Sequence, residues 1–221
     1  MSEIELWTGV DFQNHTNVPR GTFEAFEAWE ALLRKWNSRI NLVAQREVDQ
    51  FWRRHAYDSW QLNDYLPKRW DKLVDLGSGG GFPGLSLGIY AKQIGAGQVY
   101  LIESIGKKTS FLKTVSRELA LPVTIYTSRI EALSPFKADV ITARAFAPLP
   151  KLFTYAAPHL SKDGILILPK GETADKEIKD ASKGWNFDVE RFKSKTDTEA
   201  CLLYTSPSPR DATLPRMPSS A

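Results

Sequence analysis

The chain has 221 residues, 42% of them hydrophobic and 25% charged, which suits one large domain with its own core and argues against a disordered chain. A single cysteine, Cys201, excludes a disulfide framework and a cysteine-rich zinc site and predicts a reducing compartment. Residues 1–7 do not resemble a signal peptide, and no apolar run approaches the ~20 residues of a membrane helix, so we expect a cytoplasmic protein that does not enter a membrane.

The net charge is only +3, so the overall charge does not mark the chain as a nucleic-acid-binding protein. Basic residues nevertheless gather between positions 34 and 54, with only Glu47 and Asp49 as acids among them. These basic residues are Arg34, Lys35, Arg39, Arg46, Arg53 and Arg54. Such a surface can contact phosphates, and it can equally be the solvated face of a helix; the sequence leaves both interpretations open.

The N-terminal part of the chain predicts an arm followed by helices. Residues 1–21 show no hydrophobic period and are expected to form a loose arm. Residues 23–37 carry apolar side chains at spacings of three and four, which is typical of one face of an amphipathic helix. A second helix is expected over residues 48–66, and Pro67 ends it. Residues 1–70 are therefore predicted to be an arm and a helical extension.

The pattern then changes to short apolar runs that alternate with helical segments such as residues 107–120. The runs cover residues 73–77, 99–103, 123–127, 140–143 and 164–168. This alternation is typical of βαβ units with right-handed crossovers and a parallel sheet. Residues 187–193 and 199–204 lack a long helix between them and predict an antiparallel closing pair. We therefore expect a doubly wound α/β domain over residues 71–204, with a mostly parallel seven-stranded sheet.

The last segment, residues 205–221, differs from the rest in composition. It contains four prolines and four serines in 17 residues and has no apolar period, as in a disordered tail. The string from Leu202 to Asp211 also resembles a translated sequencing adapter fused to an interrupted reading frame. We therefore expect a disordered tail that is not native to the fold.

A glycine-rich loop at residues 74–84 follows a predicted strand and opens a predicted helix. Its glycines allow a sharp turn and a close approach of a ligand to the backbone, and Pro83 suits a first helical turn. A ligand there would meet backbone N–H groups at a helix N-terminus, at the switch point of the sheet. The spacing Gly79-x-Gly81-x-x-Gly84 also fits the dinucleotide fingerprint of nicotinamide and flavin enzymes.

Acidic residues near this loop favour S-adenosylmethionine over a dinucleotide. Asp75 lies inside the strand before the loop, where it would attract the cationic amino-acid half of S-adenosylmethionine and repel a pyrophosphate. Glu103 ends the next strand and is placed to accept from both ribose hydroxyls, unless it is a surface acid. Ile130 and Glu131 follow the third strand, where they face the adenine or simply begin a helix.

The turn after the fourth strand, residues 143–148, limits the atom that can be methylated. It lacks the (Asn/Asp)-Pro-Pro-aromatic sequence typical of enzymes that methylate exocyclic amines, and Cys201 is too distant in sequence to serve C5 methylation. An acceptor with a free lone pair remains, and guanine N7 is one. Such an acceptor requires positioning but no catalytic side chain. Arg144 is interpreted as the holder of a carboxylate or phosphate, with a surface ion pair as the alternative.

Taken together, these residues resemble the 16S ribosomal RNA guanine-N7 methyltransferases, known as the RsmG or GidB family. The resemblance spans roughly residues 22–204. Its segments are Trp36-Asn37-Ser38-Arg39-Ile40-Asn41-Leu42, Arg54-His55-Ala56-Tyr57-Asp58-Ser59, the loop at residues 75–84, and Arg144-Ala145-Phe146-Ala147 with Lys170-Gly171. The segment Phe51-Trp52-Arg53-Arg54-His55 and the triplet Gly80-Gly81-Phe82 look most like an alphaproteobacterial member.

The resemblance implies a class I S-adenosylmethionine-dependent fold and methyl transfer to N7 of a guanine in a hairpin loop of 16S ribosomal RNA, either free or in the small subunit. We also expect a monomer and no metal ion. The expected cofactor-binding residues are Asp75, Gly77, Gly79, Phe82, Glu103, Ile130, Glu131 and Arg144. Arg144, Lys170 and His55 are the candidates for positioning the substrate. The family's closing strand continues where this chain enters Thr205, which is a departure from the family.

For several polar residues the sequence leaves both a structural role and a role in RNA binding open. His55 and Asp58 are one helical turn apart and serve either a core hydrogen bond or the RNA entrance. Asn37 and Asn41 have the same two interpretations, and Lys107 joins Lys170 as a candidate phosphate contact. For the whole chain, the alternatives to a methyltransferase are a nicotinamide-dependent oxidoreductase and a non-catalytic RNA-binding module with the same fold.

Overall fold

The structure is a computed structural model and describes residues 6–209. Its centre is a seven-stranded sheet with the order β3-β2-β1-β4-β5-β8-β7. The strands are β1 (Lys72–Leu76), β2 (Gln98–Glu103), β3 (Val123–Thr127), β4 (Ala138–Thr142), β5 (Leu160–Lys170), β7 (Val189–Lys193) and β8 (Cys201–Thr205). The first five pair in parallel, and β8 runs antiparallel to both β5 and β7. The predicted mostly parallel seven-stranded sheet is confirmed.

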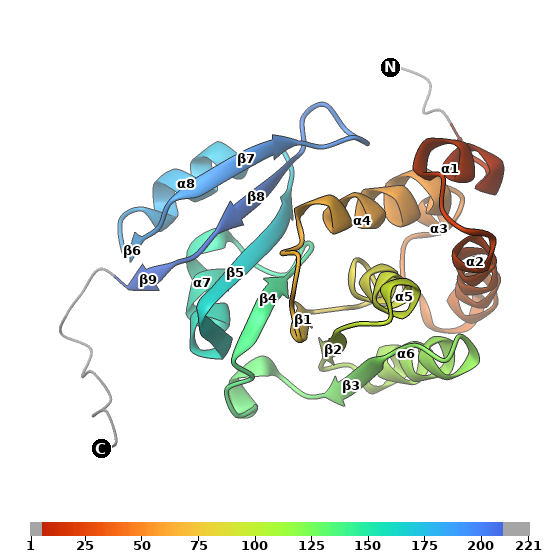
Figure 1. The fold of residues 1–221 in the computed structure, drawn as a ribbon, viewed down its shortest axis with the longest axis horizontal. Helices are drawn as coiled ribbons and strands as arrows, with labels where there is room; N and C mark the ends of the chain where they lie inside the picture. Colours follow the sequence, from red (N-terminus) through yellow and green to blue (C-terminus); the bar gives the residue numbers. More distant parts are fainter. Residues whose placement is uncertain (1–5, 210–221) are drawn as a thin grey trace.

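Helices cover both faces of this sheet (Figure 1). One face carries α2 (Arg20–Ile40), α5 (Gly84–Ile94) and α6 (Gly106–Glu118), and the other carries α7 (Leu149–Ala156) and α8 (Ala174–Ala181). Successive strand side chains alternate between the two cores, because the side-chain period of a strand is two. Leu73, Val140 and Ile167 therefore join the core under α2, α5 and α6. Their neighbours Val74, Ile141 and Leu166 join the core under α7 and α8.

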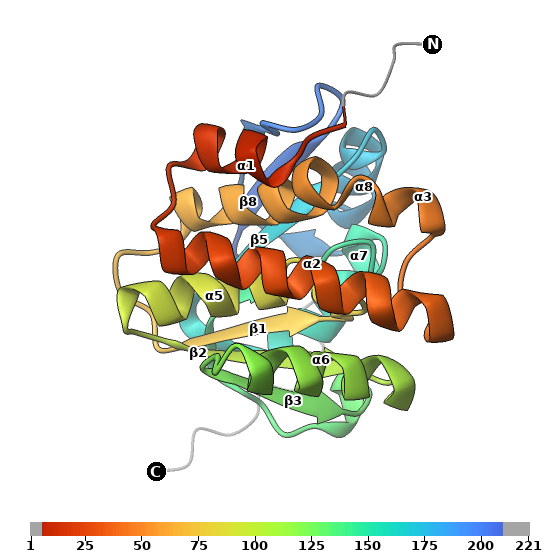
Figure 2. The ribbon, with the colours of Figure 1, turned by 90° about the vertical axis from the view of Figure 1, so that its right-hand side faces the viewer.

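The N-terminal extension packs into the same core as α5 and α6. Figure 2 shows α2 running across α5, with α6 beside it. The helix expected over residues 48–66 is present in three consecutive parts, a wide-turn π-helical segment η1 (Phe51–Tyr57), α4 (Asp58–Trp60) and the 3-10 segment η2 (Gln61–Tyr65), preceded by the short α3 (Gln45–Val48). The longest helix, α2, is amphipathic, and within residues 6–209 no helix is long and apolar enough to cross a membrane.

The expected loose arm contains a helix, α1 (Gly9–Thr16), so that prediction was wrong for these residues. The Thr8 hydroxyl accepts from the Asp11 N–H, and the Asp11 carboxylate accepts from the Thr8 N–H, which is a capping box. Phe12 is fully buried and packs on Phe26 with ring centroids 4.8 Å apart. A cap and one buried aromatic hold this short helix where an apolar period is absent.

The start of the expected disordered tail is also ordered, so the prediction was wrong for residues 205–209. Thr205 lies in β8, is buried, and donates from Oγ1 to the Asp188 carbonyl at 2.6 Å. Beyond it, β9 (Ser208–Pro209) pairs antiparallel with β6 (Trp185–Asn186). Backbone pairing orders this segment, which an apolar period cannot reveal. Residues 210–221 lie outside the described residues, and the foreign origin of the tail stays a prediction.

Candidate cofactor and substrate site

Two cavities lie side by side at the carboxyl ends of the parallel strands. The smaller, of about 380 Å³, follows the ends of β1, β2 and β3, and the larger, of about 1040 Å³, lies between the N-terminal helices and β5, α8 and β8. Both are lined by the turn Ala145, Phe146 and Ala147 that follows β4. The carboxyl edge of a parallel sheet is where ligands of doubly wound folds bind. Two ligands placed in these cavities would meet at this turn.

The smaller cavity contains four of the predicted cofactor residues, Gly77, Glu103, Ile130 and Glu131. The Glu103 carboxylate is nearly buried and is held by backbone N–H groups from two loops. Its Oε2 accepts from Gly79 at 3.0 Å, and its Oε1 accepts from Ile105 at 2.8 Å. Each oxygen keeps a second lone pair, so the carboxylate can also accept from a diol. The other predicted cofactor residues, Asp75, Gly79, Phe82 and Arg144, do not line this cavity.

Asp75 lies directly beneath the glycine loop and is completely buried. Within the described part of the chain, no hydrogen bond of good geometry reaches either of its carboxylate oxygens, although the Ser78 hydroxyl and the Gly84 N–H lie near enough to lower its pKa slightly. Burial raises the pKa of Asp75 to about 7. An unpartnered buried carboxylate is costly unless a cation reaches it. The site therefore fits the ammonium group of S-adenosylmethionine.

The conformation of the glycine loop requires a residue without a side chain at position 77. Its φ is +69°, in the left-handed region that favours glycine. A Cβ added there would lie 2.4 Å from Cδ2 of Phe146. The β1 loop and the β4 turn therefore leave no room for a side chain between Gly77 and Phe146, and these two residues form part of the wall of the smaller cavity.

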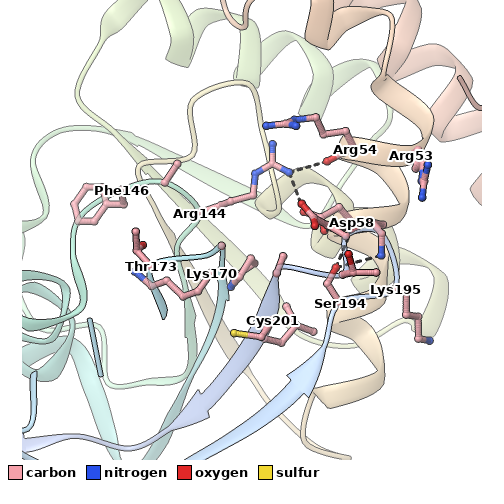
Figure 3. Close-up of a pocket in the computed structure, with 18 of the residues that line it drawn as sticks. Arg53, Arg54, Asp58, Arg144, Phe146, Lys170, Thr173, Ser194, Lys195 and Cys201 are labelled. Atoms are coloured by element: carbon pink, nitrogen blue, oxygen red, sulfur yellow. Dashed lines mark hydrogen bonds and ion pairs between the residues drawn. The ribbon is translucent and has the colours of Figure 1, made fainter. Parts of the chain in front are cut away.

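Arg144 joins the β4 turn to the N-terminal helices. Its Nη1 donates to the Asp58 carboxylate at 3.1 Å and to the Arg54 carbonyl at 3.0 Å, and its Nη2 donates to Nδ1 of His55 at 2.6 Å. The guanidinium also lies over the Phe82 ring, 5.2 Å from its centroid. His55 and Asp58, expected on one helix face, thus share Arg144 as a partner. Arg144 faces the larger cavity (Figure 3).

His55 is held as a neutral hydrogen-bond acceptor. Burial is the largest cause that lowers its pKa, to about 2, and the charges of Arg144 and Arg54 add to it. Because Nδ1 accepts from Arg144, the proton of the neutral ring is on Nε2. The ring is stacked on Phe82 with centroids 4.2 Å apart. His55 therefore orients Arg144 and Phe82 and is too weak a base to remove a proton from a substrate.

The larger cavity has polar walls on three sides (Figure 3). Arg53, Arg54 and Asp58 line one side, Lys170 and Thr173 line the opposite side, and the loop at residues 194–200 between β7 and β8 closes a third. Lys170 donates to Glu177 at 2.8 Å and to the Ala147 carbonyl at 3.2 Å. The lysine expected to contact phosphate thus also fixes the β4 turn to α8.

The basic stretch between residues 34 and 54 is partly neutralised. Arg34 pairs with Glu30 and Asp49, and Arg54 lies 3.5 Å from Glu47. Lys35, Arg39 and Arg46 are exposed, and so is Lys107 at the start of α6. Asn37 is structural, because its side chain accepts from the Val43 N–H at 3.0 Å, and Asn41 caps α2 in the left-handed region. No cluster of side chains suited to a metal ion occurs within residues 6–209.

Three parts of the site were missed by sequence reasoning, namely the loop at residues 194–200, Ala145 and Gln61. The loop at residues 194–200 is polar and aperiodic, and nothing in its own sequence indicates that it walls a cavity. Ala145 has a φ of +53°, a conformation in which a residue with a side chain is strained by roughly 1–3 kcal/mol. Gln61 could have been noticed, since it stands one turn after Asp58 on the same helical run, and it contacts that loop.

Comparison with known proteins identifies the family. The family described as GidB, rRNA small subunit methyltransferase G, matches residues 22–201. The chain is 46% identical to ribosomal RNA small subunit methyltransferase G of Rhodospirillum centenum, over 89% of each protein. It is 44% identical to the protein of that name from Cereibacter sphaeroides, over 85% of this chain and 91% of the relative.

Solved structures show the same fold at low sequence identity. A SAM dependent methyltransferase from Aquifex aeolicus has a TM-score of 0.53 and 14% identity, over 69% of this chain and 90% of that one. M. jannaschii TYW2 in complex with AdoMet has a TM-score of 0.50 and 14% identity, over 68% of this chain and 73% of that one. The sequence match excludes the nicotinamide-dependent oxidoreductase, and the chain belongs to the GidB family of small-subunit ribosomal RNA methyltransferases.

Proposed function

We propose that this protein transfers the methyl group of S-adenosylmethionine to N7 of a guanine in 16S ribosomal RNA, as free RNA or in the small subunit. One observation carries the choice of acceptor atom. The turn shared by the two cavities consists of Ala145, Phe146 and Ala147, none of which has a side chain that could accept a proton. The nearby His55 has its pKa lowered to about 2 by burial and by the charges of Arg144 and Arg54. An acceptor with a free lone pair needs no base.

S-adenosylmethionine supplies an electrophilic methyl group on a sulfonium sulfur. The lone pair of guanine N7 forms the new N–C bond while the methyl–sulfur bond breaks, and its electron pair stays on sulfur. The positive charge passes from sulfur to the guanine ring, and no proton moves. The protein's contribution is to hold the two ligands in line and to provide a suitable field.

Each predicted cofactor residue has a proposed role. Asp75 receives the ammonium group, Glu103 the ribose hydroxyls, and Ile130 with Glu131 the adenine. The backbone of Gly77 and Gly79 forms the cradle, and Phe82 supports it from below through its stacking on His55 and Trp29. Arg144 and Lys170 provide the positive charge of the larger cavity, where the RNA phosphates would lie. We also propose that the enzyme acts as a monomer in the cytoplasm.

Substitution of Glu103 by alanine is expected to weaken cofactor binding. It removes charge-assisted hydrogen bonds to the ribose, worth about 1.5–3 kcal/mol, and it frees the Gly79 and Ile105 N–H groups that the carboxylate now holds. Calorimetry should therefore show at least a tenfold loss of affinity, about 1.4 kcal/mol. The exposed Glu118 on α6 is the matched control, and its alanine variant should bind as the wild type does. Equal affinities of the Glu103 variant and the wild type would contradict the assignment.

The acceptor atom is tested on small subunits from a strain that lacks the modification. After incubation with labelled cofactor, reduction and aniline treatment should cleave the RNA at one guanine, because N7 methylation makes the ring and the glycosidic bond fragile. The rate with both substrates saturating should show no acid-range ionisation of a catalytic side chain. A label on an exocyclic amine, on ribose or on a pyrimidine carbon would overturn the proposal. Absence of labelling with intact cofactor binding would favour a non-catalytic RNA-binding module.

A further inference from the structure

The carboxylate of Asp58 has partners on two sides. Its Oδ2 accepts from Nη1 of Arg144 at 3.1 Å, on the side of the β4 turn. Its Oδ1 accepts from the Thr196 hydroxyl at 2.6 Å, on the side of the loop at residues 194–200. Figure 3 shows Asp58 between Arg144 and this loop. One side chain therefore connects a wall of the larger cavity to the turn where the two cavities meet.

Two neighbours of Asp58 hold the same loop. Gln61 donates to the Asp58 carboxylate at 2.9 Å and accepts from the Lys195 N–H at 2.9 Å. Asp64 pairs with the Lys195 ammonium at 2.6 Å. These contacts are hydrogen bonds and one half-exposed ion pair. Polar contacts of this kind can open without exposing apolar core surface, which is typical of segments of low local stability.

We propose that Asp58 is a positioning residue that couples closure of the 194–200 loop over the larger cavity to the orientation of Arg144. With the loop closed, the Thr196 hydroxyl holds Oδ1 of Asp58, and Oδ2 holds the guanidinium against His55 and Phe82. With the loop open, the carboxylate loses one anchor, and the guanidinium loses its fixed direction. The inference rests on the proposed function, because it assigns the larger cavity to the RNA.

The alternative is that Asp58 only stabilises the fold, and a set of three variants separates the two roles. Asp58→Asn removes the charge that holds Arg144. Thr196→Val removes only the hydroxyl on the loop side and keeps the ion pair. Asp64→Asn cuts a second contact of the same loop that does not reach Arg144. The reference is the methylation of small subunits by the wild-type protein. If the wild type did not methylate them, the result would count against the proposed function and not against the coupling.

In steady-state methylation, Asp58→Asn should lower kcat about tenfold or more and raise KM for the RNA substrate, with cofactor affinity unchanged. Thr196→Val should raise KM by a few-fold and also lower kcat several-fold, because the loop then no longer anchors the carboxylate that orients Arg144. Asp64→Asn should raise KM by a few-fold and leave kcat within about twofold of the wild type. Combining Asp58→Asn with Thr196→Val should give less than the product of the single effects on KM, because both act through one contact. An unchanged kcat in a folded Asp58→Asn protein, or fully multiplicative effects, would overturn the coupling.

Limited trypsin digestion measures how often the loop at residues 194–200 opens, and it requires no substrate. Cleavage after Lys195, located by mass spectrometry, should be several-fold faster in Asp58→Asn and Thr196→Val than in the wild type, because local opening controls proteolysis. Cleavage after Lys183, at the end of α8, is the internal control and should keep its rate. Equal cleavage after Lys195 in the wild type and both variants would show that Asp58 does not hold the loop and would overturn the proposal.

Discussion

Replacing Asp75 by asparagine is expected to remove measurable cofactor binding and, in the free protein above pH 7, to increase the free energy of unfolding. The wild-type carboxylate is fully buried with no hydrogen bond of good geometry among residues 6–209, and burial, which outweighs the lowering effect of Ser78 and Gly84, raises its pKa to about 7 from 3.8. Asparagine has the same shape and no charge, so the free-energy cost of burying its side chain is smaller than that of burying an ionised aspartate. Stability is thus exchanged for affinity at this position, as at many binding sites.

The sign of the pH dependence follows from the raised pKa of Asp75. Between pH 4 and pH 7 the folded protein holds a proton on Asp75 that the unfolded chain releases, so the contribution of Asp75 to the free energy of unfolding falls as the pH rises through this window. Each unit of pKa difference corresponds to about 1.4 kcal/mol, so the total is a few kcal/mol. Binding of the ammonium group requires the ionised carboxylate, and cofactor affinity should therefore increase with pH up to about 7 and then level off.

Urea unfolding at pH 5 and pH 8 without cofactor, followed by calorimetry, tests both statements. The stability difference between Asp75→Asn and the wild type should be larger at pH 8 than at pH 5. The exposed Asp163 in β5 provides the control, and its asparagine variant should show neither change. A stability difference between Asp75→Asn and the wild type that does not grow from pH 5 to pH 8, or a variant that binds the cofactor normally, would contradict the assignment of Asp75.

The mostly parallel seven-stranded sheet could be predicted from the sequence because its strands and helices follow local hydrophobic patterns. Short apolar runs such as residues 164–168 alternate with amphipathic helices, and right-handed crossovers then leave few arrangements of the strands. The same reasoning failed where one or two contacts decide the structure. The capping box at Thr8 and Asp11 orders α1, and pairing of β9 with β6 orders Ser208, and neither depends on periodicity.

In the site, too, some features could be predicted from the sequence and others could not. The glycine loop, Glu103 and Arg144 could be recognised because each follows the end of a strand, where the fold places ligands. The contacts between them could not be predicted, since they join residues far apart in the chain, as Arg144 and His55 are. Arg144 was expected to hold a carboxylate or phosphate, and the carboxylate it holds in the structure is that of Asp58. In the free protein its partners are Asp58, His55 and the Arg54 carbonyl, which explains how the cation is stabilised before a ligand binds.

Substitution of Gly77 by alanine is expected to reduce cofactor affinity about 100-fold or more, whereas Gly79→Ala should cost about tenfold. Both residues have a positive φ, +69° and +52°, so both variants incur about 1–2 kcal/mol of backbone strain. Only at Gly77 does the new Cβ also meet a ring, 2.4 Å from Cδ2 of Phe146, while at Gly79 the nearest atom is the Gly77 carbonyl oxygen at 3.8 Å. Overpacking of this kind adds roughly 1–3 kcal/mol.

A double-mutant cycle with Phe146→Ala separates the clash from the strain. If the ring is the obstacle, Gly77→Ala should be less destabilising in the Phe146→Ala background, with a coupling of about 1 kcal/mol or more in the free energy of unfolding. Gly79→Ala should show no such coupling, because its Cβ does not reach Phe146. Additive effects at Gly77 would mean that backbone strain alone explains the loss. The β1 loop and the β4 turn would then not depend on this contact, and Phe146 would be free to move between the two cavities it lines.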